Sequence, residues 1–343
     1  MSDIKIPNSL SKIFDEDNSL RPPNVSEYSI DGRDPSIVVF PENEDEISMM
    51  LKHSQSDGGT IVPWGAGTLM GLGNLPKRID AVVSTRNLNQ ILNHDPEDLT
   101  VTVQSGMTLD DLQYNLAKKG QFLPLDPPRT KETTIGGIVA TNSSGPRRIS
   151  YGTSRDILLG IRVAHPSGDI TKGGGRVVKN VAGYDMTKLY IGSLGTLGII
   201  LEMCFKVLPL PEFKSTLLIP FSSLSCAMRF INELMKSRII PSAFELIDSK
   251  AVQYVMKEDP KEPKKDFLVV LSFEGNFEEV DYKIKKICEI SSENSSLVTQ
   301  NLIDNDHEDF WKTFEELPHR INISYNNSIL CRSSILPNKV SDM

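Results

Sequence analysis

The sequence predicts an α+β fold in two parts, and three observations support this prediction. Near the N-terminus lies a β-α-β unit whose second strand, over residues 60–64, runs into a glycine-rich loop. A second glycine-rich segment covers residues 135–145. The Pro-Leu-Pro sequence at 209–211 is followed by elements in the order β-α-β-β-α, which is typical of a ferredoxin-like unit. A chain of 343 residues is long enough for two domains.

The first part combines short β-branched strands with helices that have one apolar face. Asn43 and Thr108 are residues that cap helix N-termini, so a helix is expected after each of them. Gly58-Gly59 and Gly120 are expected to end these helices. Strands are expected over 37–40, 60–64, 80–84, 99–104 and 199–208, a hairpin around the turn at 165–168, and a short helix over 185–191.

The second part begins after the Pro-Leu-Pro sequence. Strands are expected over 216–221, 243–247 and 267–273, helices over 224–237 and 278–290, and a solvated loop over the charged residues 257–266. The expected domain boundaries are an N-terminal extension over 1–19, a first domain over 20–211 and a second over 212–343.

Composition and charge exclude several classes of function. Hydrophobic residues make up 39% of the chain and charged residues 24%, which is typical of a globular protein. The net charge of -8 argues against nucleic acid as a partner but leaves room for an anionic small molecule. The first residues do not form a signal peptide, and the most apolar window, 189–205, is too short and too interrupted for a transmembrane segment. We therefore expect a cytoplasmic protein.

Metal chemistry is not expected in this chain. The four cysteines are far apart and include no C-x-x-C, so neither an iron–sulfur cluster nor a zinc site is predicted. None of the five histidines has the spacing of a metal-binding pair.

The first glycine-rich loop, at 63–73, is suited to bind a phosphate group. Its Gly65-x-Gly67-x-x-x-Gly71 pattern is similar to the fingerprint of nicotinamide-binding Rossmann domains, but no clear helix and no acidic strand end follow it. A Walker sequence is also absent. Backbone N–H groups of such a loop can instead bind a pyrophosphate without a lysine.

The ordered motifs of the first part resemble those of the PCMH-type (vanillyl-alcohol-oxidase-like) FAD-binding proteins over about residues 20–211. This resemblance implies a two-subdomain FAD-binding domain, followed by a smaller ferredoxin-like cap domain of the FAD-linked oxidase type that is short or truncated. The motifs are Pro35-x-x-Val38-Val39-x-Pro41, Gly65-Ala66-Gly67-Thr68, Asp126-Pro127, Thr134-Ile135-Gly136-Gly137, Ala140-Thr141-Asn142-x-x-Gly145, Tyr151-Gly152, Arg155-Asp156 and Gly195-Thr196-Leu197-Gly198-Ile199-Ile200.

The same resemblance implies which residues bind FAD. Covalent members of the family often carry a His near the position of Gly67, and since this chain has none, FAD is expected to be non-covalent. The implied cofactor-binding residues are Trp64, Gly65, Ala66, Gly67, Thr68, Gly71, Asp126, Pro127, Thr134, Ile135, Gly136, Gly137, Ala140, Thr141, Asn142, Gly145, Tyr151, Gly152, Arg155, Asp156, Gly198, Ile199 and Ile200.

Within this family, residues 142–148 and 179–198 resemble the FAD-binding E subunit of bacterial glycolate oxidase. Phe310-Trp311 and residues 330–333 are also similar to that protein. The resemblance implies oxidation of glycolate to glyoxylate, with electrons leaving FAD toward a second flavoprotein subunit and an iron–sulfur subunit. It also implies a place in the cytoplasm or at the inner membrane through these partners.

The catalytic residues cannot be assigned from the sequence. A 2-hydroxy acid needs a cation for its carboxylate, and the candidates are Arg147, Arg148, Arg155, Arg176 and Lys179. Arg155-Asp156 is better explained as a structural ion pair, and Arg147 and Arg148 are the preferred candidates. Because the second part has no His-x-His, two alternatives stay open. One is a self-sufficient FAD-dependent dehydrogenase for D-lactate or another 2-hydroxy acid, and the other is a non-catalytic flavoprotein that assembles a complex.

Overall fold

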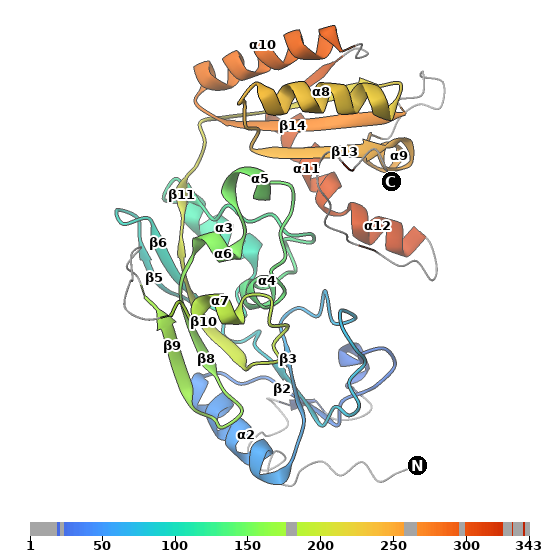
Figure 1. Cartoon of the computed structure of the whole chain (residues 1–343). Coiled ribbons are helices and arrows are strands. Elements are labelled where there is room, and N and C mark those ends of the chain that lie inside the picture. The colour runs from blue at the N-terminus through green and yellow to red at the C-terminus, as the bar shows by residue number, and fades with distance from the viewer. Residues whose placement is uncertain are drawn as a thin grey trace. The chain divides into compact units, whose positions relative to one another are not determined.

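The structure, a computed structural model, describes residues 19–20, 24–175, 184–256, 266–294, 299–324, 331 and 339. The chain divides into two compact units, and Figure 1 labels many of their elements. Unit 1 is Met1–Ser143 with Thr153–Pro209, and unit 2 is Ser144–Gly152 with Leu210–Met343. The short segment 144–152 thus belongs to unit 2, although unit 1 both precedes and follows it along the chain.

The smaller sheet of unit 1 contains the predicted β-α-β unit. Asn43 accepts the backbone N–H of Glu46 and caps helix α2 (Glu44–Asp57), and Gly58 ends the helix in the left-handed conformation. The buried side chains of α2 lie on the face that the spacing predicts. The sheet has the order β1 (Ser19–Leu20), β2 (Ile37–Val39), β4 (Ala81–Ser84) and β3 (Ile61–Trp64), with β2, β4 and β3 parallel and β1 antiparallel to β2.

The larger sheet of unit 1 is antiparallel throughout. Its strand order is β5 (Ile91–Asp95), β6 (Thr100–Gln104), β10 (Ile199–Lys206), β8 (Leu158–Ala164) and β9 (Ile170–Gly174), so the predicted hairpin and the predicted long strand are confirmed. The sequence did not predict β5, whose polar Asn93-His94-Asp95 hides the strand pattern. Smaller elements are η1 (Ser26–Tyr28), α6 (Ser154–Ile157), α7 (Thr187–Tyr190) and the pair β7 (Gln121–Phe122) with β11 (Leu208–Pro209).

Two helices pack apolar residues against this larger sheet. Helix α3 (Leu109–Ala117) is capped by Thr108 as predicted and buries Leu112 and Leu116 in the core. Helix α4 (Ile135–Thr141) lies in the glycine-rich segment, where the sequence did not predict a helix. The Thr134 hydroxyl caps α4, and burial of Ile135, Ile138 and Val139 offsets the cost of the glycines in its first turn.

Unit 2 has a ferredoxin-like sheet, as the sequence predicts. Its antiparallel strand order is β13-β14-β12-β15, and one of its faces is covered by α8 and α10 through a core that includes Phe230 and Phe273. Helices α9, α11 and α12 cover the other face. The bounds are α5 (Arg148–Tyr151), β12 (Phe213–Phe221), α8 (Leu224–Lys236), β13 (Ala243–Asp248), α9 (Ser249–Met256), β14 (Phe267–Gly275), α10 (Phe277–Glu293), β15 (Gln300–Ile303), α11 (Asp304–Glu315) and α12 (Leu317–Ser324).

Within the described ranges, no helix is long and apolar enough to cross a membrane. The same ranges contain no group of three or more His, Cys, Asp or Glu side chains that could hold a metal ion. Outside the described residues lie most of the expected extension 1–19, namely residues 1–18, and most of the expected loop 257–266, namely residues 257–265. The candidates Arg176 and Lys179 and the motif residues 330 and 332–333 also lie outside them.

Candidate functional site

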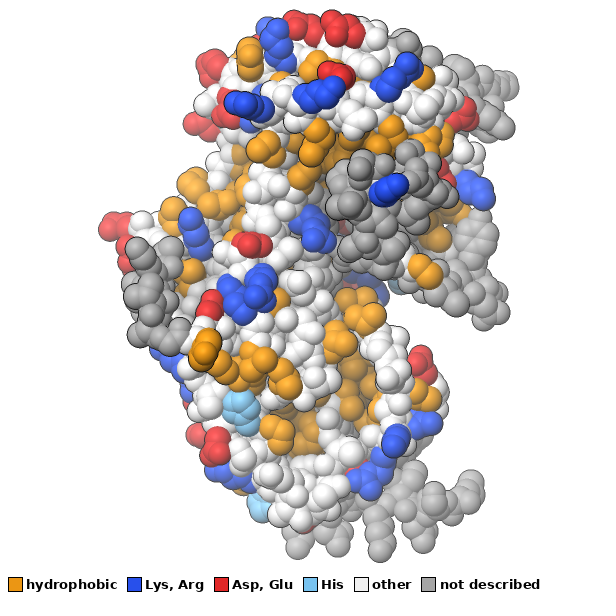
Figure 2. All heavy atoms as spheres, in the orientation of Figure 1, with side chains coloured by type: hydrophobic (Ala, Val, Ile, Leu, Met, Phe, Trp, Pro, Cys, Tyr) orange, Lys and Arg blue, Asp and Glu red, His pale blue; other side chains and the backbone are white. Residues whose placement is uncertain are grey.

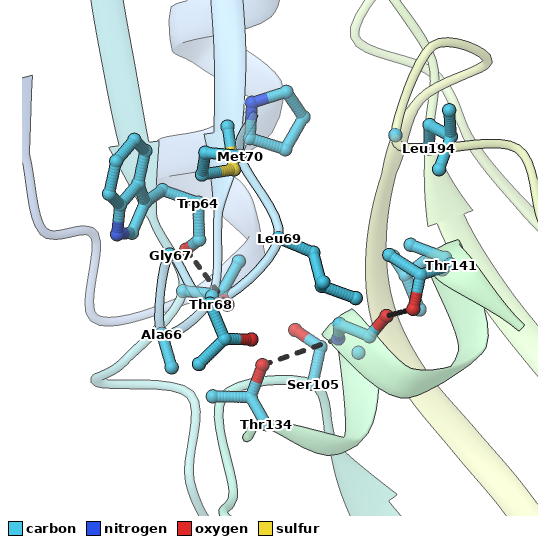
Figure 3. A pocket seen from close by; sticks show the side chains of 18 of the residues that line it. Trp64, Ala66, Gly67, Thr68, Leu69, Met70, Ser105, Thr134, Thr141 and Leu194 are labelled. Atoms are coloured by element: carbon cyan, nitrogen blue, oxygen red, sulfur yellow. Dashed lines mark hydrogen bonds between the residues drawn. The ribbon is translucent and has the colours of Figure 1, made fainter. Parts of the chain in front are cut away.

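Unit 1 contains an open cavity with an empty volume of about 900 Å³, its mouth included. Four segments form it: the loop after β3, the ends of β4 and β6, the start and inner face of α4, and the residues before and at the start of β10. Figure 3 shows the β3 loop on one side of the cavity and α4 on the other. Pockets of this size are typical of ligand and cofactor sites.

The loop after β3 owes the shape of its first residues to Gly65 and Gly67. Gly67 has a φ of +73°, and a Cβ at this position would overlap the ring of Trp64. A Cβ on Gly65 would overlap the Thr134 hydroxyl. Trp64 itself is buried and packs against Tyr28, with the ring centroids 5.1 Å apart. The loop thus packs against the Trp64 ring at Gly67 and against Thr134, the residue that caps α4, at Gly65.

The backbone N–H groups of this loop are available to a ligand. Those of Gly65, Ala66, Gly67 and Thr68 donate no hydrogen bond to any described residue. Successive free N–H groups in a tight loop form a concave site for an anion.

The backbone N–H groups at the start of α4 already have partners. Gly136 donates to the Ser105 carbonyl at 2.8 Å, and Gly137 donates to Thr134 Oγ1 at 3.2 Å. At the other end of the helix, Thr141 Oγ1 donates to the Gly137 carbonyl at 2.7 Å, which Figure 3 also draws. The paired glycines therefore serve close packing of α4, and the free N–H donors come from the β3 loop.

The described side chains that line the cavity carry no charge. None of the described residues that line it is Asp, Glu, Lys, Arg or His. Leu69, Leu72 and Leu194 line it and keep 45%, 57% and 44% of their surface exposed. On the face drawn in Figure 2, hydrophobic side chains also gather at the surface around the elements of unit 1. The site thus offers apolar surface for ring systems and neutral donors for a phosphate.

The cavity brings together many of the residues that the sequence implied for FAD. They are Trp64, Gly65, Ala66, Gly67, Thr68, Thr134, Gly136, Gly137, Ala140, Thr141, Gly198, Ile199 and Ile200. Further lining residues were not predicted from the sequence, among them Leu69, Met70, Thr85, Ser105 and Leu194. Thr85 and Ser105 directly follow β4 and β6, and a polar residue at a strand end was the signal that could have revealed them.

Other implied residues of unit 1 lie outside the described lining of the cavity. Ile135 is fully buried in the core, and Asn142 ends α4 in the left-handed conformation. Asp156 forms a capping box with Thr153. The Arg155 guanidinium donates to the Lys188 carbonyl at 3.4 Å. Arg155 and Asp156, which are both described, do not form the ion pair that the sequence predicts. Gly71, Asp126 and Pro127 also lie outside this lining.

Gly145, Tyr151 and Gly152, also implied for FAD, belong to unit 2, as do both catalytic candidates. Arg147 forms an ion pair with Glu274 of β14 at 2.8 Å, and the Glu274 side chain is only 1% exposed. The Tyr151 hydroxyl donates to the second carboxylate oxygen of Glu274 at 2.7 Å. Burial and the neighbouring Glu274 carboxylate raise the pKa of Tyr151, so it stays protonated. Arg148, in contrast, is exposed and forms no ion pair with a described residue.

A buried histidine lies near this ion pair on the same face of the sheet. His307 of α11 is 2% exposed, and its Nδ1 lies 2.8 Å from Thr216 Oγ1. The Trp311 indole N–H donates to the same oxygen at 2.8 Å, so the Thr216 proton can point to His307. Burial lowers the pKa of His307 to about 4, and the imidazole is therefore neutral at pH 7.

Two known protein families match the chain. The family described as "FAD binding domain" matches residues 35–174, and the family described as "FAD linked oxidases, C-terminal domain" matches residues 210–322. The chain belongs to the PCMH-type FAD-binding proteins. FAD is thus the cofactor of the first domain, and the α+β fold with a C-terminal domain of the FAD-linked oxidases is confirmed.

Several curated relatives of this FAD-binding protein are named as oxidoreductases of 2-hydroxy acids. Glycolate oxidase subunit GlcD from Bacillus subtilis is 36% identical over 78% of this chain and 57% of its own length. A D-lactate dehydrogenase from Anaerostipes hadrus is 33% identical over 76% of this chain and 55% of its own length. The chain thus spans little more than half the length of these relatives. The glycolate oxidase relative found here is GlcD, whereas the motifs of the sequence had indicated the FAD-binding E subunit.

Solved structures agree on the fold. Alkyldihydroxyacetonephosphate synthase superposes with a TM-score of 0.77 at 22% identity, over 92% of this chain and 63% of its own. p-Cresol methylhydroxylase superposes with a TM-score of 0.73 at 15% identity, over 91% of this chain and 68% of its own.

The residues of the cavity fit FAD. The free N–H groups of the β3 loop suit its pyrophosphate, and the apolar lining suits its rings. The buried Ser105 hydroxyl lines the cavity and has no partner within the described structure, which is expected of a group that pairs with a ligand. Among the described lining residues none is His or Cys, the residues that would form a covalent flavin link.

Proposed function

We propose that this chain is the FAD-binding part of an oxidoreductase that converts a small 2-hydroxy acid into the corresponding 2-oxo acid, with glycolate as the first candidate. The main support is the uncharged cavity of unit 1 with its free N–H groups, combined with relatives named glycolate oxidase and D-lactate dehydrogenase. Bound FAD would supply the two-electron acceptor that no amino-acid side chain provides.

The protein's own residues would bind and orient the cofactor. In this proposal the β3 loop, from Gly65 to Thr68, binds the phosphates, and Leu69, Leu194 and Ala140 provide apolar contacts that exclude water. The substrate carboxylate requires a cation. Arg148 is the better candidate, because the Arg147 guanidinium is already paired with Glu274.

We further propose that electrons leave through a partner subunit, at a cytoplasmic location or at the inner membrane through that partner. The described residues hold no cluster of Cys, His or carboxylate side chains for a second redox centre. All four cysteines, Cys204, Cys226, Cys288 and Cys331, are free thiols.

Anaerobic reduction of the purified flavoprotein tests this function. Addition of glycolate or D-lactate should bleach the absorption of the bound flavin, and the faster substrate identifies the preferred acid. Succinate, which lacks the hydroxyl group, serves as a control and should leave the spectrum unchanged. A flavin that neither acid reduces, in the chain alone and after addition of a cell extract that supplies partners, would favour the assembly role that the sequence left open.

A D-lactate dehydrogenase is the second candidate. The observation that favours it is the match to several proteins of that name, from Anaerostipes hadrus and from mitochondria of Arabidopsis thaliana and Saccharomyces cerevisiae. The ratio of kcat/KM for the two acids separates the two candidates.

A further inference from the structure

The Ser105 side chain has an unusual environment in unit 1. Its residue is 1% exposed, and its hydroxyl has no hydrogen-bond partner within the described structure. A buried hydroxyl without a partner costs about 1–3 kcal/mol, and a ligand that accepts its hydrogen bond would remove this cost. Ser105 also lines the cavity, where a ligand atom could accept a hydrogen bond from its hydroxyl.

Backbone contacts fix Ser105 in this position. Its N–H donates to the Leu201 carbonyl at 2.9 Å, and its carbonyl accepts the Gly136 N–H at 2.8 Å. The first contact ties Ser105 to strand β10, and the second ties it to the first turn of α4. The hydroxyl is therefore placed by two core elements of unit 1 and does not depend on a loop.

Two further hydroxyls lie at the same end of the cavity. Figure 3 shows the oxygens of Thr68, Ser105 and Thr134 turned toward one part of it. Thr134 Oγ1 accepts the Gly137 N–H, so its own proton remains free to donate. Thr134 also lies directly against Gly65 of the β3 loop, since a Cβ at Gly65 would overlap its hydroxyl. The three hydroxyls thus accompany the free N–H groups of the loop.

The chemistry of this donor set indicates its ligand. It consists of neutral N–H and O–H donors, and no Lys or Arg is among the described residues that line the cavity. Neutral donors in a concave arrangement are suited to an oxyanion, and the oxyanion of FAD is its pyrophosphate. We propose that the Ser105 hydroxyl donates a hydrogen bond to a phosphate oxygen of the bound dinucleotide. This inference rests on the proposed function.

The test is the affinity of the full chain, after removal of flavin, for three probes. FAD and riboflavin are titrated by the change in flavin fluorescence, and inorganic pyrophosphate is titrated as a competitor of FAD. The Ser105→Ala variant should bind FAD and pyrophosphate about tenfold to a hundredfold more weakly, because a hydrogen bond to a charged group is lost. Its affinity for riboflavin, which has no phosphate, should be unchanged.

A matched control is the Ser154→Ala variant. Ser154 is also fully buried, and its hydroxyl has no partner in the described structure, but it does not line the cavity. Loss of the Ser154 hydroxyl should leave the affinities for FAD, riboflavin and pyrophosphate within twofold of the wild type. A Ser105→Cys variant keeps the shape of the side chain with a weaker donor, and it replaces Ser105→Ala if that variant does not fold.

The outcomes separate the inference from the proposed function. Equal FAD affinities of the wild type and Ser105→Ala would overturn the inference and leave the FAD site intact. An equal loss for FAD and riboflavin would place Ser105 against the ring or its side chain and overturn the phosphate contact. A wild-type chain that binds no FAD would overturn the proposed function itself, and the inference with it.

Discussion

The cavity of unit 1 and the buried ion pair of unit 2 treat their polar groups in opposite ways. In unit 1, the cavity is uncharged, and its Ser105 hydroxyl and its β3-loop N–H groups have no partner in the described structure. In unit 2, the buried Glu274 carboxylate is paired with Arg147 and Tyr151, and His307 is held neutral beside Thr216. Groups that line a cavity and lack a partner point to a ligand, whereas buried groups that satisfy one another point to stability of the fold.

The largest expected effect is on the stability of unit 2. Replacement of Arg147 by Met leaves the buried Glu274 carboxylate without its cation, which should lower the free energy of unfolding of this unit by about 3–5 kcal/mol. Urea unfolding followed by Trp311 fluorescence measures it, in a Trp64→Phe background so that the signal comes from unit 2 alone.

The adjacent Arg148→Met variant is the control for this experiment. Arg148 is exposed and forms no ion pair within the described structure, so its loss should change the stability by less than about 0.5 kcal/mol. Equal effects of the two substitutions would show that the buried ion pair does not stabilise unit 2.

The second effect is a dependence of stability on pH. The pKa of His307 is about 4 in the folded protein and close to 6.5 in the unfolded chain. Between these values the unfolded chain binds more protons, so stability is full above pH 6.5 and falls as the pH drops toward 4. From pH 7 to pH 5 this contribution amounts to about 2 kcal/mol.

The His307→Gln variant should lack this pH-dependent contribution. Its free energy of unfolding, measured by the same Trp311 signal, should fall less between pH 7 and pH 5 than that of the wild type. Parallel pH profiles of the two proteins would mean that His307 becomes protonated in the fold, against its burial beside Thr216.

The smallest expected effect concerns Arg148, which forms no ion pair with a described residue. If Arg148 binds the substrate carboxylate, Arg148→Gln should raise KM for the 2-hydroxy acid about tenfold with little change in kcat, since an exposed charge-assisted hydrogen bond is lost. Lys285→Gln removes a positive charge from an exposed ion pair on α10 of the same unit and is the control. An unchanged KM of Arg148→Gln would remove Arg148 from the site.

Much of the fold could be predicted because its signals are local. Asn43 and Gly58 define the ends of α2 through caps that depend only on neighbouring residues. The β3 loop was also predictable, since its glycines follow directly after a strand. Helix α4 was not, because glycines weaken helices and only burial of its apolar residues in the core makes it stable.

The rest depends on contacts between residues far apart in the sequence. Segment 144–152 belongs to unit 2, where Arg147 pairs with Glu274, 127 positions further along the chain. The residues next to Arg147 in the sequence give no signal that Glu274 is its partner. The sequence therefore indicated a cation for the substrate, whereas the structure has an ion pair. Ser105 was missed for a similar reason, because only packing of α4 and β10 around it leaves its hydroxyl without a partner.

The most direct test of the central claim is the flavin content of the purified full chain. We expect a yellow protein that binds FAD in a one-to-one ratio, either as purified or after titration, and releases it into the supernatant on acid precipitation. A flavin that remains with the precipitate would contradict a non-covalent site. A chain that binds no FAD at any concentration tested would contradict the assignment of the unit 1 cavity.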